Sequence, residues 1–260
     1  MTCSEIMEKL ESLSPKHFAE NWDNVCLLVG SAQKQVKSCM LALDATDTVI
    51  DQAILMEADM LITHHPMIFK PLKKIVADDF TGKRVIKLIQ NDISLFAMHT
   101  NFDVMGMADE AAEKLGLLGS SVLEITYEDE ISKEGIGRAG EFANEMILEE
   151  CAQLVKEVFD LDQVRVFGEA SCRIKKAAIV PGSGSDYVDH AIRAGADVLI
   201  TGDISHHNGL DAVEKGISVI DAGHYGLEKI FIPYMRSFLS RELPGLQVFE
   251  ARQQSPFWHI

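Results

Sequence analysis

The chain of 260 residues has few basic side chains, few cysteines and no long apolar run. Lysine and arginine number 24 against 40 aspartates and glutamates, which gives a formal net charge of −16. A protein that binds a nucleic-acid backbone needs a basic surface, so this balance disfavours nucleic acid as a partner. No stretch approaches the ~20 apolar residues of a transmembrane helix, and residues 1–10 do not have the pattern of a signal peptide. We therefore expect a cytoplasmic protein without a membrane partner.

The five cysteines are odd in number and form no Cys-x-x-Cys pair. They indicate reduced thiols and exclude a disulfide framework or a thiolate zinc site. A length of 260 residues suits one large domain or two of about 130 residues each. With 47% hydrophobic residues, the chain has enough apolar material for a core that needs no covalent or metal cross-link.

Short apolar segments alternate with amphipathic segments along the chain. Strands are predicted at Ser38–Asp44, Asp59–Thr63, Ile93–Met98, Lys176–Pro181, Asp197–Thr201 and Ile217–Asp221. Helices are predicted at Ser4–Leu13, Asp47–Met56, Thr81–Asn91, Met107–Gly116, Asn144–Phe159, Ser185–Ala194, Gly209–Lys215 and Leu227–Leu239. The glycine-rich middle, Val122–Phe142, predicts antiparallel strands. This order is typical of βαβ units and of an α/β fold with a largely parallel sheet.

The chain also repeats itself. Residues 51–63 and 189–201 share eight identical residues at a constant offset of 138 positions, so that Thr63 matches Thr201. A second match follows in the same order, between residues 93–99 and 217–224, with one residue more in the later copy. Two matches in the same order indicate an internal duplication. We predict two related α/β domains, residues 1–125 and residues 126–260.

In both halves, polar clusters follow predicted strands. They are Thr63-His64-His65-Pro66, His99-Thr100-Asn101-Phe102-Asp103, Thr201-Gly202-Asp203 and Gly223-His224-Tyr225-Gly226-Leu227-Glu228. In open α/β sheets, functional sites gather beyond the carboxyl ends of the strands. We therefore expect these clusters to converge in space.

The types of residue in these clusters point to metal binding. His64 and His65 leave a buried strand in an extended stretch before a proline, where neighbouring side chains point in opposite directions, so each can serve a different ion. His224 and Glu228 are four residues apart at a helix start and share one face. Asp103 adds a carboxylate on a loop. Imidazoles and carboxylates without thiolates suit a pair of divalent ions such as Zn²⁺, Mn²⁺ or Fe²⁺.

Each of these features also has a structural alternative. A lone His-His pair is usually a surface feature, and a histidine and a glutamate four residues apart on a helix are usually solvated. Asp103 could cap the helix predicted near Met107. For His99 three roles stay open, namely a partner of a metal ligand, a proton shuttle or a core histidine. The segment Gly182-Ser183-Gly184-Ser185 favours a tight turn, with a phosphate cradle as the alternative.

These clusters, together with Glu20-Asn21-Trp22-Asp23-Asn24-Val25, make the chain resemble the GTP cyclohydrolase I type 2 family, which is also called the dinuclear-metal-centre hexameric protein family. The resemblance implies two similar α/β domains with a dinuclear metal site between them and a homohexamer built as a trimer of dimers. By the same resemblance, His64, His65, Asp103, His224 and Glu228 match the family's metal ligands for two divalent ions (Zn, Fe or Mn). The chain departs from the family at Cys26, where glycine is usual, and at His206, where an aromatic residue is common.

The family name implies a hydrolase that opens the guanine ring of GTP, releasing formate and giving 7,8-dihydroneopterin triphosphate. In that reaction His99 is the candidate catalytic residue for proton transfer. Lys70, Lys73 and Lys74 are candidates for binding the substrate phosphates, with a solvated loop as an equal alternative. Two other functions stay open, a metal-binding regulatory or metal-handling protein without turnover and a dimetal phosphoesterase.

Overall fold

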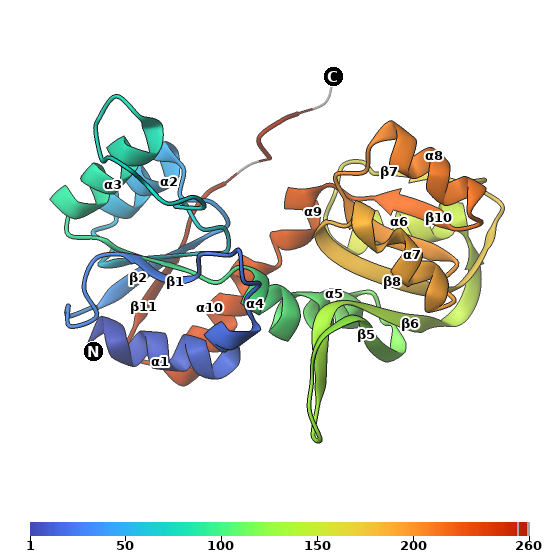
Figure 1. Ribbon diagram of the computed structural model, residues 1–260, viewed down its shortest axis with the longest axis horizontal. Helices are drawn as coiled ribbons and strands as arrows, with labels where there is room; N and C mark the ends of the chain where they lie inside the picture. Colours follow the sequence, from blue (N-terminus) through green and yellow to red (C-terminus); the bar gives the residue numbers. More distant parts are fainter. Residues whose placement is uncertain (254, 259–260) are drawn as a thin grey trace. The chain divides into compact units, whose positions relative to one another are not determined.

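The computed structural model describes residues 1–253 and 255–258, which divide into two compact units (Figure 1). Unit 1 comprises residues 1–102 and the described residues from 231 onward, and unit 2 comprises residues 103–230. The chain thus leaves unit 1 after Phe102 and returns to it after Ile230. This division differs from the predicted boundary at residue 125, which lies inside strand β5 (Leu118–Glu128). Because β5 is hydrogen-bonded to β6 (Lys133–Ile147), no domain boundary can separate these two strands.

In the described residues, unit 1 is built on a five-stranded sheet with the order β1-β4-β3-β2-β11. The last four of these are parallel, and β1 is antiparallel to β4. The strands are β1 (Cys26–Val29), β2 (Ser38–Ala42), β3 (Met60–Thr63), β4 (Ser94–Ala97) and β11 (Gln247–Glu250). The helices are α1 (Cys3–Leu13), α2 (Asp47–Leu55), α3 (Phe80–Gln90), the single turn α4 (Thr100–Phe102) and α10 (Phe231–Glu242), with a 3-10 turn at Lys16–Phe18.

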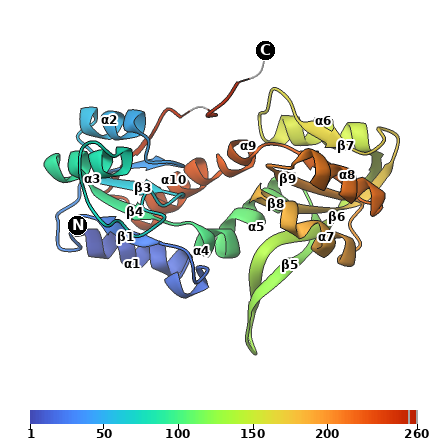
Figure 2. The same ribbon diagram turned by 45° about the horizontal axis from the view of Figure 1, so that its top comes forward.

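Strands β2, β3 and β4 are buried along their whole length, as their continuous apolar sequences require when helices cover both faces of a sheet. Helices α2 and α3 lie over one face, and α1 and α10 lie over the other (Figures 1 and 2). Met40 and Leu61 face the first pair of helices, and the next residues along each strand point to the second pair. The sheet is therefore a rigid support for the loops that follow its strands.

Unit 2 has a six-stranded sheet in the described residues, with the order β5-β6-β8-β9-β10-β7. Its remaining strands are β7 (Arg165–Phe167), β8 (Arg173–Ser183), β9 (Val198–Gly202) and β10 (Ser218–Asp221), of which β8, β9 and β10 are parallel. Its helices are α5 (Ala108–Lys114), α6 (Leu148–Val158), α7 (Val188–Arg193), α8 (His206–Glu214) and α9 (His224–Glu228), with a wide helical turn at Asp103–Met107 and a 3-10 turn at Ser185–Tyr187. In the part of the chain that the structure describes, no helix has both the length and the apolar character that a membrane crossing requires.

The two units share one pattern of hydrogen bonds, which confirms the prediction of two related α/β halves. In unit 1, Asp59 precedes β3, and its Oδ2 accepts from the backbone N–H groups of Lys37 and Ser38 at 2.7 and 3.1 Å. In unit 2, Asp197 precedes β9, and its Oδ2 accepts from the N–H groups of residues 175 and 176 at 2.8 Å each. Each residue of the second set stands 138 positions after its counterpart. The parallel order β2-β3-β4 in unit 1 recurs as β8-β9-β10 in unit 2.

The helix predicted at Leu227–Leu239 is wrong, because the chain forms two helices there, α9 and α10. Pro233 has no N–H group, and its ring would clash with the carbonyl group of Lys229 in a continuous helix. The helix therefore breaks between Glu228 and Phe231, where the chain passes from unit 2 back to unit 1. The antiparallel strands predicted within Val122–Phe142 are confirmed as β5 and β6.

Cys26 has a φ of +77°, a backbone conformation that favours glycine. We expect Cys26→Gly to be more stable than Cys26→Ala by about 1 kcal/mol, because only glycine avoids the clash between Cβ and the backbone there. The free energy of unfolding of the two variants, from denaturant titrations, measures this difference. Cys39 in β2 is the matched control, because it is buried but does not have a positive φ. At that position the alanine variant should be more stable than the glycine variant. If glycine gave no advantage over alanine at position 26 either, the prediction would be contradicted.

Candidate metal centre

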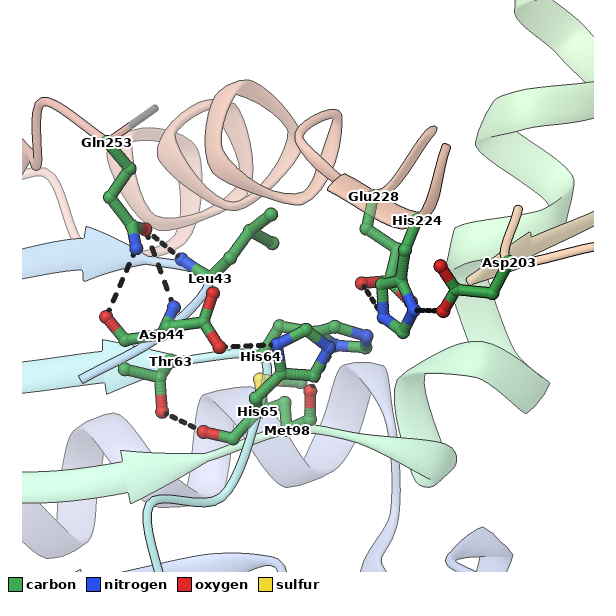
Figure 3. A network of polar contacts seen from close by, with 10 residues as sticks. All are labelled: Leu43, Asp44, Thr63, His64, His65, Met98, Asp203, His224, Glu228 and Gln253. Carbon is green, nitrogen blue, oxygen red and sulfur yellow. Dashed lines mark hydrogen bonds and ion pairs between the residues drawn. The ribbon is translucent and has the colours of Figure 1, made fainter. Parts of the chain in front are cut away.

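His64 leaves the end of β3 and is fully buried. Its backbone N–H donates to the carbonyl oxygen of Ala42, which continues the pairing of the strands by one residue. Its Nδ1 lies 2.7 Å from the carbonyl oxygen of Met98 (Figure 3). Since a carbonyl oxygen can only accept, Nδ1 carries the hydrogen and Nε2 keeps the lone pair. Nε2 is therefore the nitrogen of His64 that could bind a metal ion.

His65 is held in the same way by a carboxylate. Its Nδ1 lies 2.9 Å from Oδ1 of Asp44, which follows β2 (Figure 3). Asp44 is itself fixed by Gln253, whose Oε1 accepts from the N–H of Leu43 at 2.6 Å and whose Nε2 donates to the carbonyl oxygen of Asp44 at 3.2 Å. The Nδ1–H of His65 therefore donates to Asp44, and Nε2 is again the nitrogen that could bind a metal ion.

His99 follows β4 and completes a group of three imidazoles in unit 1. Its Nδ1 lies 3.0 Å from Oδ1 of Asp23, whose side chain is fully buried. One ligand atom from each of His64, His65 and His99 lies within 4.8 Å of the others, so these three residues could hold a metal ion. The structure brings His99 to the two predicted ligands and gives it a carboxylate partner, Asp23. Its role stays a prediction.

Asp23 keeps its charge although it is buried. Burial alone would raise the pKa of this carboxyl, but hydrogen bonds from His99 and Thr100 outweigh that effect and lower its pKa to about 2. Thr100 contributes two of these bonds, from its N–H at 3.0 Å and from its hydroxyl at 2.5 Å. Asp23 is therefore an anion near neutral pH and holds the Nδ1–H tautomer of His99.

In unit 2, His224 begins α9 and Glu228 ends it. His224 Nδ1 lies 2.8 Å from Oδ2 of Asp203, and His224 Nε2 lies 2.9 Å from Oε2 of Glu228 (Figure 3). The Glu228 side chain is only 4% exposed. A Cβ atom at Gly182 would lie 2.5 Å from Glu228 Oε1, so glycine is required there for the carboxylate to pack against the end of β8. His224 and Glu228, which are four residues apart, share one face of the helix, as predicted.

Asp103 is the first residue of unit 2 and opens the wide turn before α5. The alternative that Asp103 caps this helix is wrong, because Met107 stands at the cap position and makes no side-chain capping bond. The assignment of Asp103 as a metal ligand stays a prediction.

The lysines predicted to bind phosphate, Lys70, Lys73 and Lys74, are exposed in the irregular segment between β3 and α3. Their role also stays a prediction. Of the predicted tight turn Gly182-Ser183-Gly184-Ser185, the first two residues end β8, and Ser185 begins the 3-10 turn Ser185–Tyr187. A Cβ atom at Gly184 would lie 2.1 Å from Thr201 Oγ1, so both glycines are needed for close packing of the chain.

Four histidines share one feature: an acceptor oxygen lies within hydrogen-bond distance of Nδ1. In His224, Nε2 also lies 2.9 Å from Oε2 of Glu228. An acceptor at Nδ1 is the usual environment of histidines that bind metal ions, because it fixes the tautomer and the ring orientation. The chemistry of the donors therefore fits borderline divalent ions. Sequence reasoning did not assign the acceptors Asp23, Asp44 and Asp203. Asp23 and Asp203 lie inside motifs singled out from the sequence, and Asp44 ends a predicted strand; these positions are the signal that could have identified them.

We expect Asp203→Asn to weaken metal binding about tenfold, because the amide can no longer accept from His224 as strongly as the carboxylate does. Asparagine tolerates the positive φ of 57° at this position, so the backbone should be preserved. Isothermal titration of the metal-free protein with Zn²⁺ or Mn²⁺ measures the affinity. Asp211→Asn, an exposed aspartate on α8, is the control and should bind as the unmodified protein does. Equal affinities for the two variants would contradict an orienting role of Asp203.

The profile of the family Duf34/NIF3 (NGG1p interacting factor 3) matches residues 1–256. A protein of Clostridium acetobutylicum named "GTP cyclohydrolase 1 type 2 homolog" is 40% identical over 221 residues, which cover 84% of this chain and 82% of the relative. A Bacillus cereus protein related to NIF3 has a crystal structure that matches all of this chain and 99% of its own, with a TM-score of 0.91 and 26% identity. Staphylococcus aureus protein SA1388 matches over the same shares with a TM-score of 0.90 and 31% identity. The predicted resemblance and the α/β fold class are therefore confirmed.

Proposed function

Because the chain belongs to the Duf34/NIF3 family, we propose that it is a hydrolase that uses two divalent metal ions to open the guanine ring of GTP. The products would be formate and 7,8-dihydroneopterin triphosphate. The observation that supports metal-dependent chemistry most strongly is the shared arrangement of the histidines, each with Nδ1 bound to an acceptor oxygen. The name of the Clostridium acetobutylicum relative suggests the reaction.

In this proposal His64, His65, Asp103, His224 and Glu228 hold the two ions, which are Zn²⁺, Fe²⁺ or Mn²⁺. The ions would supply Lewis acidity, which polarises the reacting centre, neutralises developing negative charge and activates water near neutral pH. The burial of His64 and Glu228 excludes bulk water from the donor atoms and strengthens every electrostatic interaction with them.

His99 is the proposed proton carrier. Its Nδ1–H is held by Asp23, so Nε2 is the nitrogen that can take up or release a proton during ring opening. The carboxylate of Asp23 stabilises the imidazolium that forms when Nε2 is protonated. With a side-chain exposure of 17%, His99 is partly open to solvent, as a group that exchanges protons with water must be.

The test is a turnover assay on protein loaded with Zn²⁺, Mn²⁺ or Fe²⁺ and incubated with GTP. We expect formate together with a pterin that becomes fluorescent on oxidation. A His64→Ala/Glu228→Ala double variant is the control and should give only background product. The same background from the unmodified protein with every metal would refute the hydrolase. Release of phosphate without formate would instead identify a dimetal phosphoesterase.

A further inference from the structure

Two large aromatic side chains beside His99 are exposed to solvent. Trp22 is 57% exposed and Phe69 is 47% exposed. Their ring centroids are 5.6 Å apart with an angle of 52° between the planes. The Trp22 ring also meets the His99 ring edge-on, at a centroid distance of 6.1 Å. We call Trp22 and Phe69 the aromatic corner.

The aromatic corner is held in place from both sides. The side-chain amide of Asn24 donates to the carbonyl oxygen of Ile68 at 2.5 Å, which ties the segment that carries Trp22 to the segment that carries Phe69. The residue after Trp22 is Asp23, which is anchored to His99 and to the backbone that follows β4. The two rings are thus preorganised, and a ligand that stacks on them would need to order little of the chain.

The segment that carries Phe69 differs in charge from the whole chain, whereas Trp22 is flanked by Glu20 and by the buried anion Asp23. Residues 66–76 contain Lys70, Lys73 and Lys74 and no aspartate or glutamate, in a protein with a net charge of −16. Phe69 is followed directly by the first of these lysines. A local excess of positive charge beside exposed aromatic rings is the combination that recognises a planar base with an attached anionic group.

We infer that the aromatic corner stacks on the planar heteroaromatic ring of the substrate, while the lysines of residues 66–76 attract its anionic group. This inference rests on the proposed function for the presence of such a ring near His99, and it adds the residues that select for it. Stacking tolerates any base that has a π face, so Trp22 and Phe69 would select for a ring over a ring-free polyphosphate. The reacting ring would then lie next to His99, which is in edge contact with Trp22.

The test uses intrinsic fluorescence. The chain has two tryptophans, Trp22 and Trp258, so Trp258→Phe leaves Trp22 as the sole tryptophan reporter. Guanosine, GTP and inorganic tripolyphosphate are titrated separately into this full-length protein, with and without added Zn²⁺. We expect guanosine and GTP to quench Trp22 and tripolyphosphate to leave it unchanged. GTP should bind at least tenfold more tightly than guanosine.

Phe69→Leu in the same background should weaken the binding of both guanosine and GTP about tenfold or more. Phe80→Leu is the matched control, because Phe80 is an exposed phenylalanine of unit 1 at the start of α3 and should leave both affinities unchanged. Replacing all three lysines, Lys70, Lys73 and Lys74, by glutamine should weaken the binding of GTP about tenfold and leave the binding of guanosine unchanged. Thermal melts verify that each variant is folded.

The inference is overturned if guanosine causes no quenching, or if Phe69→Leu binds guanosine as tightly as Phe80→Leu does. Its failure can be told apart from failure of the proposed function. Quenching by guanosine without formate release would leave the aromatic corner as a base-binding site and refute the hydrolase. Formate release from GTP with an unchanged KM in Phe69→Leu would support the hydrolase and refute stacking.

Discussion

Replacing Glu228 with glutamine is expected to reduce turnover by at least 100-fold and to remove the stabilisation that bound metal gives. Glutamine keeps the shape of the side chain, which packs against Gly182, but loses the negative charge that the ions require. Metal bound to the folded state raises its stability by mass action, so the unmodified protein should melt at a higher temperature when Zn²⁺ or Mn²⁺ is added. Thermal melts at several metal concentrations should show this rise for the unmodified protein and little or none for Glu228→Gln.

Without metal, the effect of this substitution on stability should be small. Glutamine removes the cost of burying a charge, but it also weakens the contact with His224 Nε2, which lies 2.9 Å from Glu228 Oε2. Glu214→Gln, an exposed glutamate at the end of α8, is the matched control for loss of one charge. Unchanged metal stoichiometry and affinity in Glu228→Gln would contradict the assignment of Glu228 as a ligand.

Asp23→Asn is expected to lower both activity and stability. The amide cannot accept from His99 and from both donors of Thr100 at once, so His99 loses its fixed tautomer, and turnover should fall by about 10²–10⁴-fold. The pKa of Asp23 lies at about 2 against an ordinary value of 3.8, a shift that corresponds to on the order of 2 kcal/mol of stability for this fully buried side chain.

The stability difference should depend on pH in a defined direction. The pKa of Asp23 is lower in the folded state, so its contribution is complete above about pH 5 and is lost as the pH falls from about 4 to about 2. Denaturant titrations at several pH values should show a constant difference between the unmodified protein and Asp23→Asn near neutral pH, and a vanishing difference near pH 2. Asp78→Asn, an exposed aspartate of the same unit, should show no such dependence. A difference that stays constant down to pH 2 would contradict the role of the Asp23 charge.

The sequence predicted the parallel strands at the centre of each sheet, because strands buried on both faces are continuous apolar runs. It did not predict β1, β7 and β11, which have three or four residues each and lie at the edges of their sheets. An edge strand is less completely buried than a central strand, so its sequence need not be a continuous apolar run. Its pairing also depends on distant parts of the chain. Strand β11 pairs with β2 across about 200 positions, a contact that no local pattern encodes.

At the candidate site, too, a local sequence pattern does not show the contacts between distant residues. Four histidines stand out in the sequence because they follow predicted strands of the two duplicated halves. They are His64, His65, His99 and His224. The aspartates that accept from them do not stand out, because an aspartate in a loop or at the end of a strand is more often a turn or cap residue. The backbone carbonyl of Met98 could not have been predicted at all, since every residue has one. Only the tertiary pairing shows that each imidazole has an acceptor.

The discontinuity of unit 1 has a consequence for how the protein assembles on the ribosome. Unit 2 is one continuous segment, so it can fold as soon as residues 103–230 have emerged. Unit 1 emerges first but must wait for β11 and for Gln253, which fixes the Asp44 that holds His65. We therefore expect the second-made unit to fold before the first-made one. A nascent chain would then complete the histidine group of unit 1 only in the final stage of translation, after unit 2 has folded.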